Sequence, residues 1–264
     1  MGLVRLLGRH ISYSASPRMQ SAAFAVLGLS HRYELADVSV DDLPGAVAAL
    51  RNEDSLGANV TVPHKGAVLA LLDEVDELAR EAGAVNTIVR RGRRLSGSNT
   101  DVPAIADEIR ALRPQPRHVL VLGAGGAARG VQRALEIVGA TSVGLVSRSG
   151  NGGSRPWARL AELLPEADLL INATPVGTLT DETPVPARLL RGELAVLDLV
   201  YRPSPTRLVR EARAAGAAAR GGAGILLGQG WRSLETWLGR SVPARARQAM
   251  AAALRDELGD GADV

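Results

Sequence analysis

A glycine-rich stretch near the middle of the chain constrains the fold more than any other feature. The residues Gly123-Ala124-Gly125-Gly126-Ala127-Ala128 follow an apolar run at 119–122 and precede a helical pattern at 129–138. The first glycine permits a tight turn, the second lets the backbone approach a pyrophosphate, and Ala128 lets the helix pack closely on the strand. The N-terminus of that helix can then receive the phosphates. The pattern predicts a parallel α/β domain that binds a dinucleotide, and a plain glycine turn is the alternative.

The end of the next predicted strand indicates which dinucleotide is bound. NAD-binding domains usually carry Asp or Glu about 20 residues after the glycines, where the carboxylate accepts hydrogen bonds from the adenosine ribose. Here that position holds Ser147-Arg148-Ser149, and no acidic residue lies between Glu136 and Glu162. Arg148 can bind a 2′-phosphate through two hydrogen bonds, and Arg155 can add a second charge. The pattern favours NADP over NAD, the alternative being that Arg148 is only an exposed arginine at a strand end.

The predicted elements divide the chain into two α/β parts. Its 264 residues are 46% hydrophobic and 22% charged, which suits one large globular domain or two small ones. The clearest boundary lies between Asp101 and Pro116. Before it we expect mainly parallel strands at 4–8 and 57–62, helices at 16–28, 43–50 and 68–82, and a hairpin at 85–95 turning at Gly92. After it we expect parallel strands at 119–122, 143–147, 169–173 and 195–199 with helices between them, then helices at 229–238 and 243–258.

The composition argues against several classes of protein. Without cysteine the chain cannot form disulfides, thiolate nucleophiles or sulfur-ligated metal sites, which fits a reducing, cytoplasmic location. The four histidines show no ligand spacing, so we predict no metal site. No run of about 18 apolar residues suggests a membrane span, and no signal-peptide pattern is present. The net charge is only +3, and the basic run at 90–94 has no neighbouring aromatic residues, which disfavours nucleic-acid binding.

One lysine stands out from an arginine-rich composition. Of the 31 lysine and arginine residues, Lys65 is the only lysine. Arginine can replace lysine in most surface roles, but it cannot replace an amine that must lose a proton. Lys65 is therefore a candidate for proton transfer, and its chance survival in a composition biased towards arginine is the alternative.

Short polar residues gather around Lys65 and near the first helix. The strand period of two places Asn59 and Thr61 on one face and Val60 and Val62 on the other. Polar residues also follow at 86–87 and 98–101, which suits a polyhydroxylated ligand, although turn chemistry would give each of these residues singly. Ser14 and Ser16 present hydroxyls at a helix N-terminus that would favour a carboxylate, while ordinary N-capping explains Ser16 alone, with Pro17 at the first helical position.

These motifs together resemble the shikimate dehydrogenase family. The matching segments follow the family's order over nearly the whole chain: Ser14-Ala15-Ser16-Pro17, Asn59-Val60-Thr61-Val62-Pro63-His64-Lys65, Ala84-Val85-Asn86-Thr87, Asn99-Thr100-Asp101, the glycine loop, Asn172-Ala173-Thr174-Pro175 and Gln229. The resemblance implies two α/β domains. Residues 1–102 and 224–264 would form a substrate-binding domain to which the C-terminal helices return, and residues 103–223 a Rossmann-type NADP-binding domain.

The resemblance also implies roles for individual residues. Lys65 and Asp101 would form the catalytic pair, which also contacts the substrate. Ser14 and Ser16 would hold the shikimate carboxylate, with Asn59, Thr61, Asn86, Asp101 and Gln229 on the ring hydroxyls and Tyr201 near the substrate. The cofactor phosphates would meet Gly123, Ala124, Gly125, Gly126, Ala127, Ala128 and Arg129. Ser147, Arg148 and Ser149 would lie near the adenosine, and Thr174, Val176 and Gly222 near the nicotinamide.

The chain departs from the family pattern beside the adenosine. The family usually has Asn-Arg-Thr where this chain has Ser147-Arg148-Ser149, and a short loop at 150–153 replaces the helix that normally follows. A second basic residue expected there has no counterpart unless Arg155 substitutes for it. Ile225 stands where methionine is common, a change that conserves volume and should cost little.

The activity implied by the resemblance is the reversible, NADPH-dependent reduction of 3-dehydroshikimate to shikimate in aromatic amino-acid (chorismate) biosynthesis. We expect a cytoplasmic enzyme with a small-molecule substrate and no nucleic-acid or membrane partner, acting as a monomer or homodimer. One alternative is a catabolic quinate/shikimate dehydrogenase that uses NAD, against which the missing acidic residue argues. The other is a non-catalytic nucleotide-binding regulator, against which the presence of both Lys65 and Asp101 argues.

Overall fold

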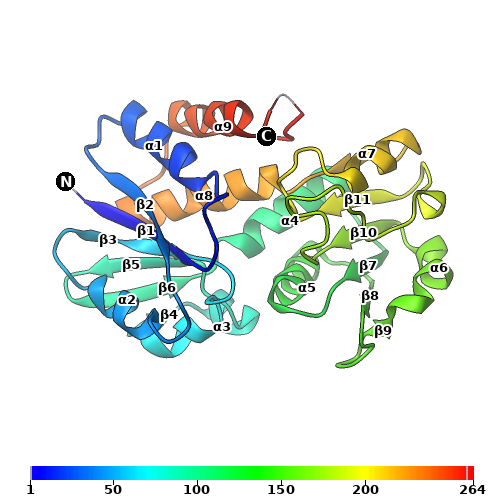
Figure 1. Ribbon diagram of the computed structural model, residues 1–264, viewed down its shortest axis with the longest axis horizontal. Coiled ribbons are helices and arrows are strands. Elements are labelled where there is room, and N and C mark those ends of the chain that lie inside the picture. The colour runs from blue at the N-terminus through cyan, green and yellow to red at the C-terminus, as the bar shows by residue number, and fades with distance from the viewer. Residues whose placement is uncertain (1, 260) are drawn as a thin grey trace. The chain divides into compact units, whose positions relative to one another are not determined.

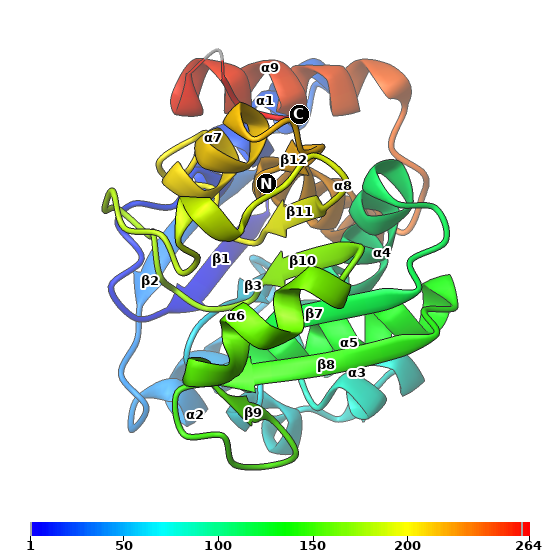
Figure 2. The ribbon, with the colours of Figure 1, turned by 90° about the vertical axis from the view of Figure 1, so that its right-hand side faces the viewer.

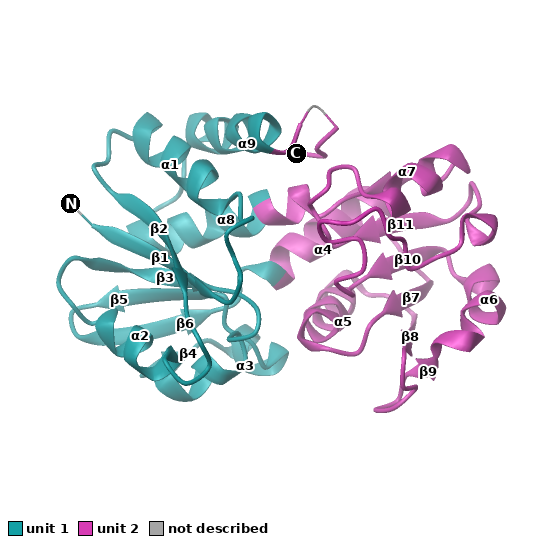
Figure 3. Cartoon of the chain, in the orientation of Figure 1, with its two compact units in different colours: residues 1–101, 227–257 teal, residues 102–226, 258–264 magenta. Residues whose placement is uncertain are grey.

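The computed structural model describes residues 2–259 and 261–264. The chain forms two compact units (Figure 3), one comprising Met1–Asp101 and Leu227–Glu257 and the other Val102–Leu226 and Leu258–Val264. Each unit contains one six-stranded sheet with helices on both faces (Figure 1), which confirms the predicted α/β class.

The sheet of unit 1 has the strand order β2-β1-β3-β5-β6-β4. The parallel pairs are β1 with β2, β1 with β3 and β4 with β6, whereas β5 is antiparallel to both β3 and β6. The expectation of mainly parallel pairing and the predicted hairpin are therefore both confirmed, whereas the antiparallel pairing of β5 with β3 was not predicted. The strands are β1 Leu3–Gly8, β2 Arg32–Asp37, β3 Ser55–Val60, β4 Glu74–Val75, β5 Thr87–Arg91 and β6 Arg94–Ser98.

Helices cover both faces of this sheet. Figure 1 shows α1, α8 and α9 on one side and α2 and α3 on the other. Ala58 and Val60 point into the apolar core beneath α2, which also contains Val47 and Ile88. Because side chains alternate along a strand, Asn59 faces the opposite side, where it meets α8. The helices are α1 Ser16–Val26, α2 Leu43–Ala49, the 3₁₀ turn η1 Ala67–Leu71, α3 Glu77–Ala82, α8 Ala223–Leu238 and α9 Ala244–Leu258.

The predicted strand at 57–62 is two residues too long at its C-terminal end. β3 ends at Val60, and Val62 beyond it is 70% exposed. The predicted alternation of Asn59 and Val60 is present, but it does not continue to Val62.

The single helix predicted at 68–82 is wrong. The segment contains η1, the short edge strand β4 and then α3. Asp73 causes the first interruption, because its backbone N–H donates to Leu95 O (3.0 Å) and its carboxylate accepts from Leu95 N (2.7 Å), which draws the chain onto β6. Asp76 then starts a new helix by accepting a hydrogen bond from Ala79 N (2.7 Å) as its N-cap.

The N-terminus of α1 also differs from the prediction. Ser16 is the first helical residue, the N-cap position is held by Ala15, and no side chain caps this helix. Instead, Ser14 Oγ accepts a hydrogen bond from Ser16 N at 3.3 Å. The expected N-capping by Ser16 is therefore wrong, while Pro17 does lie in the first turn as predicted.

Unit 2 contains a sheet in which every pair is parallel, with the order β12-β11-β10-β7-β8-β9. Its four central strands were predicted to within a residue or two at each end. The run at 119–122 is almost completely buried, as expected for a strand covered by helices on both faces. The strands are β7 His118–Leu122, β8 Ser142–Ser147, β9 Arg155–Pro156, β10 Leu169–Asn172, β11 Ala195–Asp198 and β12 Ala219–Arg220.

The helices of unit 2 lie on both faces of this sheet, with α5 behind it and α6 in front of it in Figure 2. A core of buried aliphatic residues joins the strands to α6 and α7, including Leu120, Leu170, Leu160 and Leu208. No helix was predicted at 101–112, where the structure has α4. The helices and 3₁₀ turns are α4 Asp101–Leu112, α5 Gly126–Val138, η2 Trp157–Arg159, α6 Leu160–Leu163, η3 Leu164–Glu166, η4 Ala187–Leu189 and α7 Arg207–Ala214.

Candidate active site

Lys65 and Asp101 form an ion pair in unit 1. The distance from Lys65 Nζ to Asp101 Oδ2 is 2.8 Å, and the side chains are 33% and 21% exposed. Both groups therefore remain accessible to a ligand while they contact each other. A primary amine held by a carboxylate can deliver a proton to a substrate oxygen or remove one from it.

Backbone hydrogen bonds hold both members of this pair. Lys65 follows the end of β3, and its carbonyl accepts from Val85 N at 2.8 Å. Asp101 begins α4, and its N–H donates to Asn99 Oδ1 at 3.0 Å, while Asn99 Nδ2 donates to Ala84 O at 2.8 Å. The segment at 84–85 is thus tied to both residues, which fixes their separation.

A buried network of polar side chains lies in the same unit. Asn59 is 5% exposed, and its amide nitrogen lies within hydrogen-bonding distance of Asn86 O, Thr87 Oγ1 and Ser233 Oγ, at 3.0, 3.2 and 3.0 Å. Its Oδ1 accepts from the Tyr33 hydroxyl at 2.8 Å. Both amide hydrogens of Asn59 therefore have acceptors inside the protein.

Asn86 belongs to the same network, and one of its amide hydrogens has no acceptor among the described residues. Its Nδ2 donates to Thr100 Oγ1 at 2.9 Å, and its Oδ1 accepts from Thr100 N at 2.8 Å. Ser233 connects the network to α8 because its hydroxyl also lies 2.9 Å from Gln229 O. The polar residues at 86–87 and 98–101 were noticed in the sequence, but Ser233 and Tyr33 were not, because no local pattern distinguishes them from surface residues.

The remaining predicted substrate residues have different positions. In unit 1, Ser14 and Thr61 are half-buried, and Ser16 and Gln229 are 6% and 8% exposed. Tyr201 is half-buried in unit 2, three residues after β11. The substrate set predicted from sequence is thus held mainly by unit 1.

The glycine loop of unit 2 has the geometry that a pyrophosphate requires. Gly123 has φ +112°, and a Cβ there would lie 3.0 Å from Ala173 O. A Cβ on Gly125 would meet nothing within 4 Å, so the space beside it is open. Gly125 is the N-cap of α5 and supplies no side-chain acceptor, so that the first N–H groups of the helix are available to an anion. The loop fits the dinucleotide predicted from its sequence.

The predicted adenosine segment follows β8. Arg148 and Ser149 are exposed, whereas Ser147 is 9% exposed and its hydroxyl lies 2.7 Å from Ser154 Oγ. β9 pairs with β8 so that Arg155 is opposite Val146, which brings a second exposed arginine to the same strand end. Because neither Arg148 nor Arg155 forms an ion pair within the described residues, both guanidinium groups are available to a phosphate.

The predicted nicotinamide residues follow the carboxyl ends of two strands, Thr174 and Val176 after β10 and Gly222 after β12. Asn172 Oδ1 accepts from Thr174 N and Thr174 Oγ1, at 3.0 and 2.7 Å. Gly222 N donates to Val200 O at 3.0 Å, and a Cβ on Gly222 would come within 2.2 Å of Leu199 O, so only glycine fits there. Ligands of open parallel sheets bind at this edge.

A buried carboxylate lies behind these loops. Asp198 is fully buried at the end of β11, and burial raises its pKa to about 6 although hydrogen bonds from Thr206, Val200 and Asn172 oppose the shift. This residue was not predicted as part of any site.

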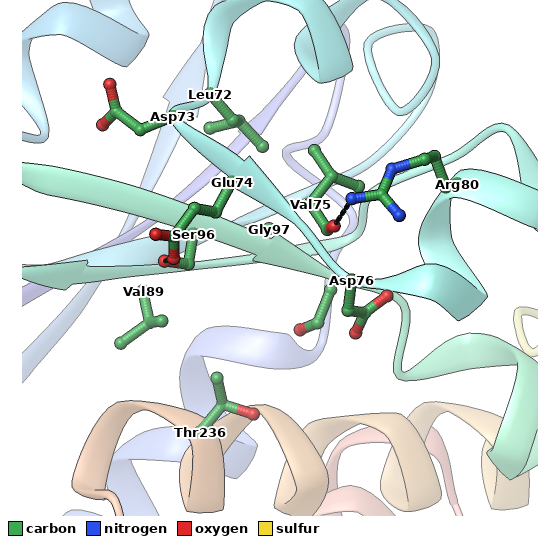
Figure 4. Close-up of a pocket in the computed structure, with 11 residues that line it drawn as sticks. Leu72, Asp73, Glu74, Val75, Asp76, Arg80, Val89, Ser96, Gly97 and Thr236 are labelled. Atoms are coloured by element: carbon green, nitrogen blue, oxygen red, sulfur yellow. Dashed lines mark hydrogen bonds between the residues drawn. The ribbon is translucent and has the colours of Figure 1, made fainter.

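A cavity of about 670 Å³ in unit 1 contains none of the predicted site residues. It lies beside β4 and β6 (Figure 4), and its acidic side chains already have structural partners. Asp73 pairs with Arg51, Asp76 caps α3, and Glu74 pairs with Arg94 at 2.8 Å. The acidic groups of this cavity therefore serve to hold the edge of the sheet in place.

Within 2–259 and 261–264, no group of three or more His, Cys, Asp or Glu side chains could hold a metal ion. Over the same residues, no helix combines the length and the apolar composition needed to cross a membrane.

Comparisons with known proteins agree with these observations. Residues 6–88 match the family model for the shikimate dehydrogenase substrate binding domain. The shikimate dehydrogenase (NADP(+)) of Symbiobacterium thermophilum is 40% identical over 97% of this chain and 95% of its own length. That of Rubrobacter xylanophilus is 42% identical over 90% of each chain. The crystal structure of shikimate 5-dehydrogenase from Thermus thermophilus in complex with NADP(H) and shikimate has a TM-score of 0.87 and 36% identity, covering 98% of this chain and 100% of that one. This chain is therefore a member of the shikimate dehydrogenase family.

Proposed function

We propose that this protein is an NADP-dependent shikimate dehydrogenase that interconverts 3-dehydroshikimate and shikimate. The observation that carries the proposal is the 2.8 Å contact between Asp101 and the only lysine of the chain. The relatives named above are shikimate dehydrogenases (NADP(+)), which supports both the substrate and the cofactor.

The residues of unit 1 supply the proton chemistry of this reaction. Reduction of the ring ketone produces an alkoxide that must gain a proton, and the Lys65 ammonium can deliver it. Asp101 accepts a hydrogen bond from the same nitrogen and so holds the ammonium group in position. In the reverse direction Lys65 removes the proton of the hydroxyl group. The hydride itself comes from the nicotinamide of NADPH when that cofactor is bound.

Other residues hold the substrate. We assign Ser14 and Ser16 to its carboxylate, and Thr61, Asn86, Asp101 and Gln229 to its hydroxyls, with Tyr201 nearby. Asn59 stays a predicted contact of the ring hydroxyls, and its amide hydrogens also hold Asn86 and Thr87 in place. On the cofactor side, residues 123–129 would bind the pyrophosphate and Ser147, Arg148 and Ser149 the adenosine end.

Substitution of Lys65 tests the proton-transfer role. Lys65→Ala should lower kcat by roughly a hundredfold or more, because general acid–base catalysis contributes at least that much. Lys65→Arg keeps the positive charge but cannot release a proton, so it should be nearly as inactive. Steady-state kinetics of shikimate oxidation measures both.

A matched control removes an exposed cation from the same unit. Arg93 lies at the tip of the β5–β6 hairpin, and Arg93→Ala should leave kcat unchanged. Turnover close to that of the wild type in Lys65→Arg would show that Lys65 acts only through its charge, and the proton-transfer role would be lost.

A matrix of two cofactors and two substrates separates this proposal from the alternatives. NADP with shikimate should be the most efficient combination. Comparable efficiency with NAD, or with quinate, would favour a catabolic quinate/shikimate dehydrogenase. NADP binding without turnover of either substrate would favour a non-catalytic regulator. A cytoplasmic location and a monomeric or homodimeric state remain predictions, which cell fractionation and sedimentation can test.

A further inference from the structure

Asp198 is a buried carboxylate without a charged partner. It has no exposed surface at the end of β11, and no described cationic group pairs with it. Its Oδ1 accepts from Asn172 Nδ2 (2.8 Å) and from Val200 N (3.0 Å), and its Oδ2 accepts from the Thr206 hydroxyl (2.7 Å). Because burial raises its pKa to about 6, the ionised form costs folding free energy at neutral pH. Stability therefore does not explain why a carboxylate occupies this position.

The carboxylate determines which way the Asn172 amide points. Asn172 is fully buried, and its Nδ2 donates to Asp198 and to Val176 O, the latter at 3.3 Å. Its Oδ1 accepts from both the N–H and the hydroxyl of Thr174. An ionised carboxylate can only accept hydrogen bonds, so it selects the orientation that directs Nδ2 towards Asp198 and Oδ1 towards Thr174.

One side chain thus fixes the backbone that leaves two neighbouring strands. Asn172 and Asp198 are directly paired in the β10–β11 register. Through Asn172, Asp198 holds Thr174 and Val176, and through its own contact it holds Val200 N. Val200 O in turn accepts from Gly222 N at 3.0 Å. All three residues assigned to the nicotinamide side are tied to this carboxylate.

We propose that Asp198 is a positioning residue, acting mainly through Asn172, that shapes the loops receiving the nicotinamide end of NADP. The proposal rests on the proposed function, since it requires NADP as the cofactor. Asp198 touches neither substrate nor cofactor. Its effect should be largest at the nicotinamide end, because its hydrogen bonds go to Asn172, Val200 and Thr206 and none joins it to the glycine loop or to residues 147–149.

The variant Asp198→Asn tests this role by calorimetric titration with two ligands. Its amide presents a donor as well as an acceptor, so it no longer dictates the orientation of Asn172. The Kd of NADP should rise about tenfold, the effect of roughly one hydrogen bond. The Kd of 2′-phospho-ADP-ribose, which lacks the nicotinamide, should stay unchanged. Unchanged NADP affinity, or an equal loss for both ligands, would overturn the proposal.

A second variant tests whether Asp198 acts through Asn172. Asn172→Ser should weaken NADP without affecting 2′-phospho-ADP-ribose, and adding Asp198→Asn to it should cause little further loss. Fully additive losses would contradict the relay. If Asp198→Asn does not fold, Asn172→Ser decides alone, since normal NADP affinity there overturns the proposal.

A control variant and the wild-type protein show whether the proposed function fails or only the role of Asp198 does. Glu166→Gln removes an exposed carboxylate from the same unit and should change neither Kd. A wild-type protein that does not bind NADP would overturn the proposed function together with this inference. Wild-type binding with an unaltered Asp198→Asn affinity would overturn the role of Asp198 alone.

Discussion

At the scale of single residues, Asp198 makes stability depend on pH in an unusual direction. Burial raises its folded-state pKa from 3.8 to about 6, so the folded protein holds this proton more tightly than the unfolded chain does. The carboxyl group therefore favours folding most at low pH, and this contribution is lost as the pH rises through about 6. Most paired carboxylates, whose folded-state pKa is lowered, do the opposite.

We expect Asp198→Asn to remove this dependence. The unfolding free energy of the variant minus that of the wild type should increase by up to about 3 kcal/mol between about pH 4 and about pH 8, which corresponds to about two pKa units. Urea denaturation across the pH series measures it. Glu166→Gln should show no such trend, and a difference that shrinks with rising pH would contradict the assigned burial.

Arg148 carries a prediction about cofactor choice. Because its exposed guanidinium has no ion-pair partner among the described residues, we expect it to bind the 2′-phosphate of NADP. Arg148→Ala should raise KM for NADP about tenfold or more and leave KM for NAD unchanged, since a charge-assisted hydrogen bond contributes roughly 1.5–3 kcal/mol. Kinetics with both cofactors measures the ratio.

Two comparisons sharpen this test. Arg155→Ala, at the paired position on β9, should show a smaller loss of the same kind. Arg188→Ala removes an exposed arginine from η4 and should change neither KM. Equal losses with NADP and NAD in Arg148→Ala would show that the arginine does not recognise the phosphate.

Residue chemistry explains why Lys65 was predictable as a candidate for proton transfer and why the residues that support the two sites were not. Lys65 could be identified because arginine replaces lysine everywhere else in the chain. Ser233 and Asp198 could not be identified from the sequence, because a serine in a helix and an aspartate at the end of a strand are usually exposed. Their roles follow from the side chain to which each one hydrogen-bonds in the folded protein. Ser233 contacts Asn59, and Asp198 contacts Asn172.

At the scale of elements, the N-cap of α3 carries the next prediction. Asp76 accepts from Ala79 N at 2.7 Å and separates α3 from β4. Asp76→Ala should lower the unfolding free energy by about 1 kcal/mol, because one helix N–H loses its acceptor. Asp76→Asn keeps an acceptor and should lower it much less. Equal losses in the two variants, measured by urea denaturation, would contradict capping as the cause.

The two halves of the chain differ in how far their elements could be predicted. The strands β7, β10 and β11 at the centre of the parallel sheet in unit 2 are buried on both faces, so each contains a run of three or four apolar residues. The segment at 68–82 has apolar residues at helical spacing, yet Asp73 hydrogen-bonds to Leu95 and diverts the chain into the sheet. That contact joins residues 22 positions apart in the sequence, so the periodicity within the segment gives no indication of it.

At the scale of the whole molecule, ligand binding should stabilise the fold by mass action. At about 100 times its Kd, NADP should contribute about 2.7 kcal/mol, which raises the unfolding midpoint by roughly 5–10 °C in a chain of this size. Calorimetry should show the same shift in Lys65→Ala, because Lys65 belongs to unit 1 and the glycine loop to unit 2. NAD at the same concentration should shift the midpoint less. A midpoint unaffected by NADP would contradict the cofactor assignment.

The amino-acid sequence was enough to predict the α/β class, and it drew attention to the glycine loop, to the absence of an acidic residue after β8, and to Lys65, to which we assign proton transfer. These features are local, since they depend on residue type and on spacing within one segment, whereas the pairing of Lys65 with Asp101, 36 residues away, was expected only from the family resemblance. The antiparallel pairing of β5 with β3, the break at Asp73 and the buried contacts that orient Asn59 and Asn172 became known only from the folded protein. Those depend on hydrogen bonds between segments that are distant in sequence, because a buried polar group must find its partner wherever the fold supplies one.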